Sequence, residues 1–374
     1  MKKVLLAIAV FVMAICANAQ KNQYFWYQGN LMMGNPIAQI DSVTFGEGEP
    51  TDTLHIMLPR TIIKTVHDTL YVTIHDTICP EGSWENGILP GVFSVSSNKQ
   101  VKFSQGNLQF NAMGGSHKCA DGTTQQGIWR FAKNQWDFVG DDTDGTVYNN
   151  NVKCNNELIS SSYNGWIDLF GEGTSGWSGG ASCHQPWATT AGYGCGCYKC
   201  GNYEGTYADW GKYNAIENGG NTPDMWRVLN QSEWNYLLDS RTNASQLKGL
   251  ATINNVKCLV LLPDNWNAPA GVLFTSSEDY STNQYSAEQW HALEVAGAVA
   301  LPAAGLRAGS KDGNQDISEY AHLWQYQYHD NGSTGQYWVS TGSYELMFYH
   351  NRINCGDYRW SCWGSAVRLV QDVK

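Results

Sequence analysis

The sequence predicts an α+β fold in which one large, loop-rich domain follows a small β unit and an extended stalk. From about residue 91 the chain is rich in glycine and tryptophan. Aromatic residues make up 13% of the 374 residues, and charged residues only 15%. Three stretches have the spacing of amphipathic helices, and most of the remainder alternates short apolar runs with turn residues. Few helices among many short strands are typical of α+β domains.

The first 19 residues have the pattern of a secretory signal peptide. Lys2 and Lys3 precede an apolar run from residue 4 to 15, which ends in "CANAQ" and predicts cleavage after Ala19. The apolar run is too short to span a bilayer. Lipidation of Cys16 is disfavoured because the bulky Ile15 precedes it. We therefore expect an exported protein that is secreted or located at the cell surface or in the periplasm.

Two segments precede the large domain. Residues 20–48 form a predicted small β unit, in which "YFWYQGNLM" and "IAQIDSVTFG" are separated by the turn signal "GNP". Residues 49–90 contain the imperfect repeat "TVHDTLYV" and "TIHDTICP" and lack a helical pattern. An extended strand would place His67 and His75 on one face. A Thr-rich spacer is favoured over a metal site, so we expect a stalk before a domain at 91–374.

The three expected helices each have start or stop signals. In "YADWGKYNAIENGG" (207–220), three aromatic or apolar residues recur at helical spacing before a pair of glycines. In "NQSEWNYLLDSR", Asn230 and Glu233 have the spacing of a capping box, and in "SAEQWHALEVAG" Ser286 and Gln289 repeat it. Trp234 is expected to be buried.

Charge and motifs exclude several function classes. The formal net charge of −11 repels phosphate backbones, so we expect no nucleic-acid partner. The sequence contains no nucleophile elbow, HExxH motif, phosphate loop or dinucleotide fingerprint. In "GDDTDGT" (140–146), Asp141, Asp142 and Asp144 resemble part of a calcium loop without its bidentate Glu. An acidic surface turn is therefore favoured over a calcium site.

A cysteine cluster is the other candidate metal site. Cys195, Cys197 and Cys200 form a C-x-C-x2-C pattern, and Cys183 with His184 lies twelve residues upstream. Zinc prefers four Cys or His ligands, but structural sites usually pair two C-x2-C knuckles and only one is present. Disulfides, free thiols and a metal site all remain open, and export favours disulfides. We therefore expect no bound cofactor.

The large domain resembles a known family. "WRVLNQSEWNYLLDSR" (226–241) is similar to the "W-R-L-P-T-x-x-E-W" signature of the formylglycine-generating enzyme-like, C-type lectin-related fold. Other segments resemble a subgroup, the Fibrobacter succinogenes major paralogous domain family. These segments are "FSVSSNKQVKFSQGNLQF", "WRFAKNQWDFVG", "YNGWIDLFGEGTSGW", "AGAVALPAAGLR", "GQYWVST" and "SAVRLV". The resemblance covers roughly residues 91–371.

The resemblance implies a C-type lectin-like domain whose terminal strands pair. It implies core roles for Trp226, Arg227 and Trp290, with Arg227 paired to a carboxylate. It also raises an alternative function, because formylglycine-generating enzymes use two copper-binding cysteines late in the domain. Cys355 and Cys362 lie there but are farther apart than in the enzyme motif. A disulfide between them is favoured over copper-dependent oxidase chemistry.

The strongest functional signal is the segment "SYELMFYHNRINCGDYRWSCWG" near the C-terminus. Its alternation predicts a strand, and the resemblance suggests that Leu346 and Phe348 face the core. The outward residues and the following loop then form an expected ligand-binding set, because Tyr, Trp and Arg dominate binding hot spots. This set comprises Glu345, Met347, Tyr349, His350, Arg352, Asp357, Tyr358, Arg359 and Trp360.

The sequence therefore predicts an exported, non-catalytic recognition protein that binds an extracellular protein or glycan through this face. In some relatives of the fold, retroelements diversify the corresponding positions, and the bulky residues here fit such a surface. The copper-dependent oxidase is one alternative, and a structural surface component that displays the domain is another.

Overall fold

In the computed structural model, the described residues form two compact units, Met1–Pro80 and Glu81–Lys374. In the first unit, the structure describes the backbone of the strands at residues 22–27, 30–36, 62–66 and 69–73. The described ranges of the second unit are 84–138, 160–178, 181–188, 202–305, 334–342, 344–358 and 364–373. The predicted signal peptide lies outside all of these ranges. No helix within them is long and apolar enough to cross a membrane.

The described strands of the first unit form two antiparallel hairpins. Strand β1 (Asn22–Tyr27) pairs with β2 (Asn30–Pro36), and β3 (Ile62–Val66) pairs with β4 (Thr69–Thr73). The predicted turn "GNP" therefore lies inside β2. The segment predicted as an extended stalk holds the β3–β4 hairpin, because its two β-branched runs are close enough to pair their backbones. The other parts of residues 37–83, including His67 and His75, lie outside the described residues.

The second unit begins before residue 91. The turn η2 (Glu85–Gly87) leads to Leu89, which is fully buried and whose backbone N–H donates to the carbonyl of Phe103 at 2.9 Å. Because these residues complete the core, the domain boundary lies about ten residues earlier than the sequence indicated.

The two ends of this domain meet in one sheet, with the order β10-β19-β6-β5. The hairpin of β5 (Phe93–Ser96) and β6 (Lys99–Phe103) pairs with β19 (Leu369–Asp372) near the C-terminus. Strand β10 (Arg227–Val228) pairs with the other side of β19. The expected pairing of terminal strands is therefore present.

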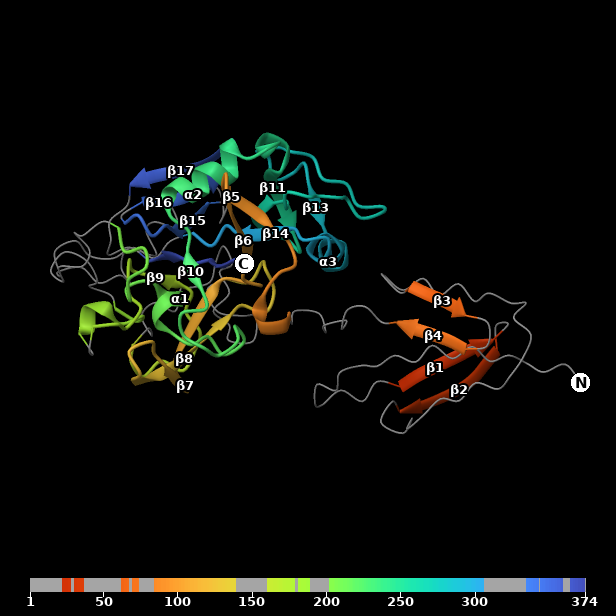
Figure 1. Cartoon of the computed structure of the whole chain (residues 1–374), viewed down its shortest axis with the longest axis horizontal. Coiled ribbons are helices and arrows are strands. Elements are labelled where there is room, and N and C mark those ends of the chain that lie inside the picture. Colours follow the sequence, from red (N-terminus) through yellow and green to blue (C-terminus); the bar gives the residue numbers. More distant parts are fainter. Residues whose placement is uncertain are drawn as a thin grey trace, which may run out of the picture. The chain divides into compact units, whose positions relative to one another are not determined.

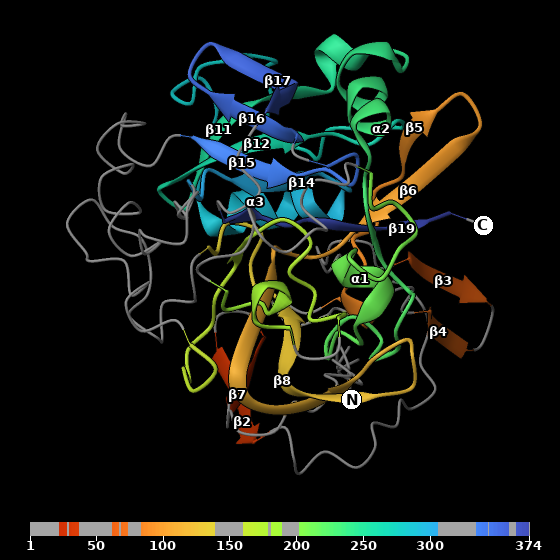
Figure 2. The same ribbon diagram turned by 90° about the vertical axis from the view of Figure 1, so that its left-hand side faces the viewer.

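Two further sheets enclose the apolar core. The first has the order β13-β11-β12-β14. Its strands are β11 (Lys248–Ile253), β12 (Val256–Leu261), β13 (Gln284–Tyr285) and β14 (Val299–Pro302). The second has the order β17-β16-β15-β18-β9. Its strands are β9 (Leu169–Phe170), β15 (Gly335–Trp338), β16 (Tyr344–Tyr349), β17 (Arg352–Tyr358) and β18 (Ser365–Ala366). Figures 1 and 2 show β15, β16 and β17 side by side.

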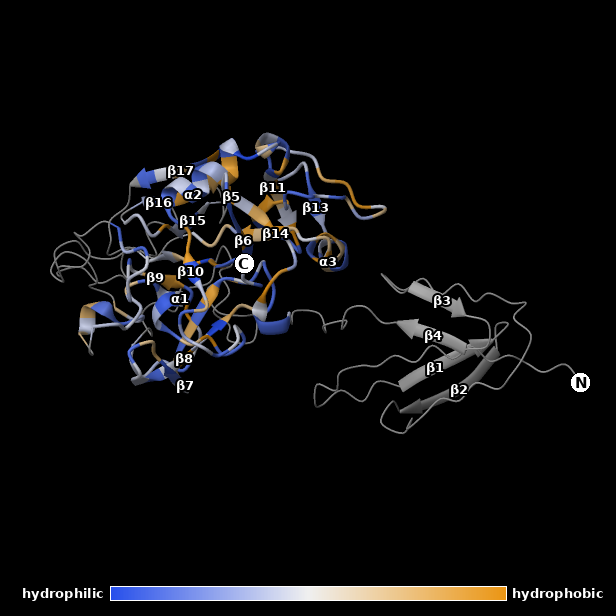
Figure 3. Cartoon of the chain, in the orientation of Figure 1, coloured by the Kyte–Doolittle hydropathy of each residue, from blue (hydrophilic) through white to orange (hydrophobic). Residues whose placement is uncertain are grey.

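A long hairpin completes the domain. Strand β7 (Leu108–Lys118) pairs with β8 (Thr124–Phe131), and the register shifts between Asn111 and Ser116. Apolar colouring is concentrated on strands such as β11 and β14, whereas β17 is mainly polar (Figure 3). The described part of this domain is therefore a strand-rich α+β structure with several small sheets.

The two predicted capping boxes are confirmed. Helix α2 (Gln231–Asn235) begins after Asn230 and continues into the π-turn η6 (Tyr236–Ser240), and α3 (Ala287–Val295) begins after Ser286. Among the described residues, η4 (Ser182–His184) and η7 (Ala244–Gln246) are further short 3-10 helices.

The first predicted helix is much shorter than expected. Helix α1 spans only Trp210–Tyr213, and Asn214 is extended. The Asn214 side chain contacts the His117 ring at 2.8 Å and donates to the carbonyl of Ser175 at 3.1 Å. These tertiary hydrogen bonds hold Asn214 out of the helix and satisfy its buried amide.

The predicted scaffold residues are buried. Trp226, Trp234 and Trp290 are each at most 1% exposed. Arg227 forms a bidentate pair with Glu233, at 2.7 and 2.9 Å, and also contacts Asp372 at 2.6 Å. Because Asp372 belongs to β19, this pair joins the terminal sheet to α2.

Candidate functional site

The β16–β17 hairpin carries most of the expected ligand-binding set. Strand β17 forms one edge of its sheet, and Tyr349 is paired with Arg352 across the turn. Asn351 has φ of 64° in this turn, a left-handed conformation that Asn tolerates better than most residues. The backbone N–H of Asn351 also donates to the carbonyl of Glu278 at 2.9 Å. The tip of the hairpin is therefore anchored to the loop that carries Glu278.

The expectation that Glu345 and Met347 face outward is wrong. Glu345 is fully buried and accepts a hydrogen bond from the Ser365 hydroxyl, and Met347 is 4% exposed. Strand β16 lies inside the sheet, and one of its faces contributes Leu346 and Phe348 to the core. Since the other face is also covered, both alternating sets of side chains are buried.

Three members of the expected set come together as one group, which we call the hairpin cluster: Tyr349, Arg352 and Asp357. The Arg352 guanidinium donates to both Asp357 carboxylate oxygens, at 2.8 and 3.0 Å, and to the Tyr349 hydroxyl at 3.2 Å. It also lies 5.7 Å from the centre of the Tyr349 ring. The cluster therefore presents a cation, an aromatic ring and a carboxylate in one fixed arrangement.

The electrostatics of the hairpin cluster keep its arginine charged. The pKa of Arg352 is raised, mainly by its hydrogen bond to Tyr349 and further by the Asp357 carboxylate. The Arg352 side chain remains 38% exposed and that of Asp357 20% exposed. A ligand can therefore reach the cluster without unfolding the hairpin.

The remaining members of the set differ in how far the structure describes them. His350 is exposed next to the cluster, with its Nδ1 atom 3.8 Å from the Asp279 carboxylate. In β17, the backbone of Tyr358 pairs with that of Tyr344 in β16. Arg352, Asp357 and Tyr358 therefore lie in a strand rather than in the expected loop. Arg359 and Trp360 lie outside the described residues.

Cys355 is a buried free thiol, which differs from the expected disulfide with Cys362. Its side chain belongs to the main hydrophobic core, and burial raises the pKa of its thiol to about 12. Cys362 lies outside the described residues. The thiol of Cys355 therefore stays protonated at neutral pH.

The candidate metal sites lie mostly outside the described ranges. Cys195, Cys197 and Cys200 fall there, as do Asp141, Asp142 and Asp144. Cys183 lies in η4 and is disulfide-bonded, and the neighbouring His184 stacks on Trp177. Within the ranges that the structure describes, no three His, Cys, Asp or Glu residues are grouped so that they could hold a metal ion.

Comparisons with known proteins identify no relative. No family model, curated protein or solved structure matches the chain. The candidate site is therefore interpreted from its own geometry.

Proposed function

We propose that the protein is an exported recognition protein that binds an extracellular protein or glycan through a face centred on the hairpin cluster. The observation that carries this proposal is the preformed contact of Tyr349, Arg352 and Asp357 on an exposed edge hairpin. Tyrosine and arginine dominate binding hot spots because they offer large contact areas and several hydrogen bonds.

The rigidity of the hairpin cluster favours a binding role. Arg352 is held by Asp357 and Tyr349, and Asn351 fixes the turn to a neighbouring loop. Side chains that are already ordered lose less entropy when a ligand binds. Arg359 and Trp360 follow β17 directly in the sequence.

We propose a C-type lectin-like fold for the second unit, with the paired strands β6 and β19 as its support. That fold carries ligands on a variable, loop-rich region near the C-terminal strands. Diversification of this face by a retroelement is part of the proposal. A neighbouring reverse transcriptase gene and an adenine-rich near-copy of the 3′ end are expected in the encoding genome. If both are absent, the proposal of diversification is wrong and the proposal of ligand recognition is unaffected.

The burial of Cys355 disfavours the alternative of a copper-dependent oxidase. Copper(I) and covalent oxidase chemistry both require an accessible thiolate. Cys355 is 7% exposed, and its raised pKa keeps the thiol protonated. A thiol in this environment is suited to packing within the core.

A binding screen with matched variants tests the proposed function. The purified full-length secreted chain is applied to arrays of glycans and of extracellular proteins, together with R352A and Y349A. We expect each variant to weaken binding of any captured ligand by about tenfold or more, because each removes a central contact. K102A, in strand β6 of the terminal sheet, serves as a control for general loss of charge.

Two outcomes would contradict this proposal. One is that every captured ligand keeps its affinity in both R352A and Y349A. The other is copper binding with oxygen uptake on a cysteine-containing peptide, lost when Cys355 is replaced by alanine.

A further inference from the structure

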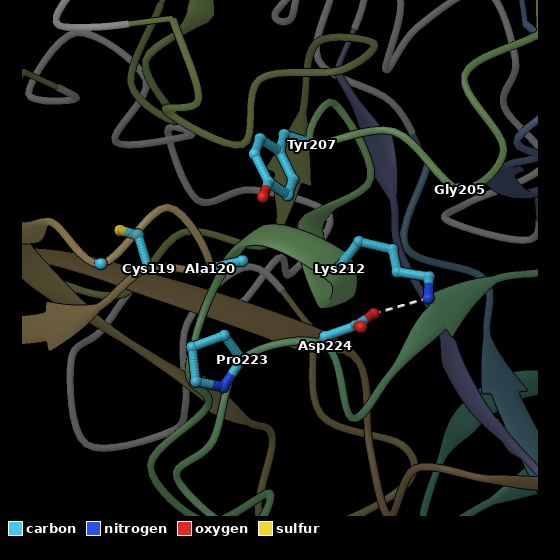
Figure 4. Close-up of a pocket in the computed structure, with 8 residues that line it drawn as sticks. Cys119, Ala120, Gly205, Tyr207, Lys212, Pro223 and Asp224 are labelled. Carbon is cyan, nitrogen blue, oxygen red and sulfur yellow. Dashed lines mark hydrogen bonds and ion pairs between the residues drawn. The ribbon is translucent and has the colours of Figure 1, made fainter.

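A second surface feature lies away from the hairpin cluster. A depression of about 420 Å³ lies between the β7–β8 turn, the loop before α1 and the loop before β10 (Figure 4). Its volume lies within the range of small-molecule sites. It is lined by Cys119, Ala120, Gly122, Gly205, Tyr207, Lys212, Pro223 and Asp224.

Tyr207 gives this depression an aromatic surface. Its side chain is 44% exposed, one of the few large apolar side chains so exposed among the described residues. The ring lies 5.3 Å from that of Tyr213, and the carbonyl of Tyr207 accepts a hydrogen bond from the Ser175 hydroxyl at 2.6 Å. The structure therefore leaves the Tyr207 ring exposed at the surface, in contact with the Tyr213 ring on one side.

The charged groups of the depression cancel one another. Lys212 Nζ lies 2.5 Å from the Asp224 carboxylate, and Figure 4 shows this pair beside the space below Tyr207. Cys119 is neutral, because burial raises the pKa of its thiol. The nearby Asp121 carboxylate already accepts hydrogen bonds from Tyr213 and Thr123. The lining residues themselves therefore carry no net charge, and the neighbouring Asp121, whose pKa is lowered by its hydrogen bonds from Thr123, adds a negative charge that disfavours an anionic ligand.

We propose that this depression binds a neutral sugar ring, with the ring stacked on Tyr207 and its hydroxyls bridging Lys212 and Asp224. A pyranose has an apolar face of C–H groups and a rim of hydroxyls, which matches one exposed aromatic ring beside a paired donor and acceptor. A charged ligand would have to compete with the ion pair, whereas hydroxyl groups can bond to both partners while the pair persists.

The backbone around the depression leaves room for such a ligand. A Cβ atom added at Gly122 or Gly205 would meet no atom within 4 Å. Space is therefore open above both turns, so the sugar ring can belong to a longer glycan. This site is separate from the hairpin cluster, so a negative result for sugar binding here would not contradict the proposed function.

Saturation-transfer difference NMR tests the proposal. The probes are the methyl glycosides of glucose, galactose, mannose and N-acetylglucosamine, added to the full-length chain. We expect saturation of the ring C–H protons of at least one glycoside. Y207A should weaken its binding by about fivefold, since an aromatic contact contributes about 1 kcal/mol. Y207F should retain most of it, because the phenyl ring still stacks.

Two further variants test the polar contacts. Asp224 has φ of 63°, and Asn tolerates this conformation, so D224N removes the charge without straining the turn. We expect D224N and K212M each to weaken the glycoside by a few-fold. L273A, which removes an exposed apolar side chain outside both proposed sites, is the matched control and should leave glycoside binding unchanged.

Three results would overturn the sugar site. These are the absence of saturation transfer for all four glycosides, unchanged binding in Y207A, and tighter binding of glucuronate or glucose 6-phosphate than of the neutral glycosides. Unchanged thermal unfolding of Y207A would show that a loss of binding arises at the site, since this side chain is exposed.

Discussion

Two arginine–carboxylate pairs in this domain have hydrogen bonds of similar length and different surroundings. Arg227 donates from two guanidinium nitrogens, whereas Arg352 donates from one. Arg227 binds Glu233 through two hydrogen bonds at 2.7 and 2.9 Å, and Arg352 binds Asp357 through two at 2.8 and 3.0 Å. The side chains of Arg227 and Glu233 are 9% and 7% exposed, whereas those of Arg352 and Asp357 are 38% and 20% exposed.

Because they differ in burial, the two pairs have different roles. When one partner of a buried pair is removed, the remaining charge is left without water or a counter-charge. When an exposed pair is broken, water solvates the separated charges, so the pair contributes little to the free energy of unfolding. The Arg227 pair therefore holds the domain ends together, whereas the Arg352 pair remains available to a ligand.

The largest expected effect is that of R227M on stability. The substitution leaves Glu233 buried without its main partner, so we expect the free energy of unfolding to fall by about 3–5 kcal/mol. Urea unfolding followed by tryptophan fluorescence measures this change. A loss below about 1 kcal/mol would show that Lys99, which lies 3.0 Å from Glu233, compensates for the missing arginine.

The same pair predicts a dependence of stability on pH. Partial desolvation raises the pKa of Glu233 and Asp372, but the hydrogen bonds and charge of Arg227 outweigh it and lower the pKa of both. Carboxyls with a lowered pKa stabilise the fold above their unfolded pKa, and this contribution disappears as the pH falls through the folded value. We therefore expect the stability difference between wild type and R227M to be largest near pH 7 and to shrink below about pH 4. Urea midpoints across pH 3–7 would measure it, and a difference that grows on acidification would contradict this account.

A smaller effect is expected at the start of α2. N230A removes the side chain that accepts a hydrogen bond from the Glu233 backbone at 2.8 Å. We expect a loss of about 1 kcal/mol, which is typical of an N-cap residue. S286A, at the equivalent position of α3, provides the matched comparison. A loss in N230A as large as that in R227M would indicate that the cap also positions Glu233 for its ion pair.

The smallest effect on stability is expected for R352M. Because its pair with Asp357 is partly exposed, we expect a loss below about 1 kcal/mol, measured by the same urea unfolding. Ligand binding should fall far more in this variant than in R227M under conditions where both are folded. A stability loss equal to that of R227M would assign Arg352 to the scaffold.

Sequence patterns were sufficient where the interactions are local. The Asn230 and Ser286 capping boxes formed as expected, because each joins residues three positions apart. The hairpin of β5 and β6 and the burial of Trp226, Trp234 and Trp290 were also predictable, since short alternating runs pair readily and large aromatic side chains avoid water.

Only the tertiary structure decided which residues of the C-terminal segment remain exposed. Alternation, together with the resemblance that placed Leu346 and Phe348 inward, left Glu345 and Met347 outward. However, β16 lies between two neighbouring strands and is covered on both faces. The early end of α1 at Tyr213 likewise depends on hydrogen bonds from Asn214 to distant segments.

The depression beside Tyr207 could not be read from the sequence, which placed that residue at the start of a helix. Its lining comes from three segments between Cys119 and Asp224 that only the folded chain brings together. The sequence by itself determined the local elements and the residue types of the core. The fold determined which of the remaining aromatic and charged side chains meet at the surface, because that depends on packing between segments far apart along the chain.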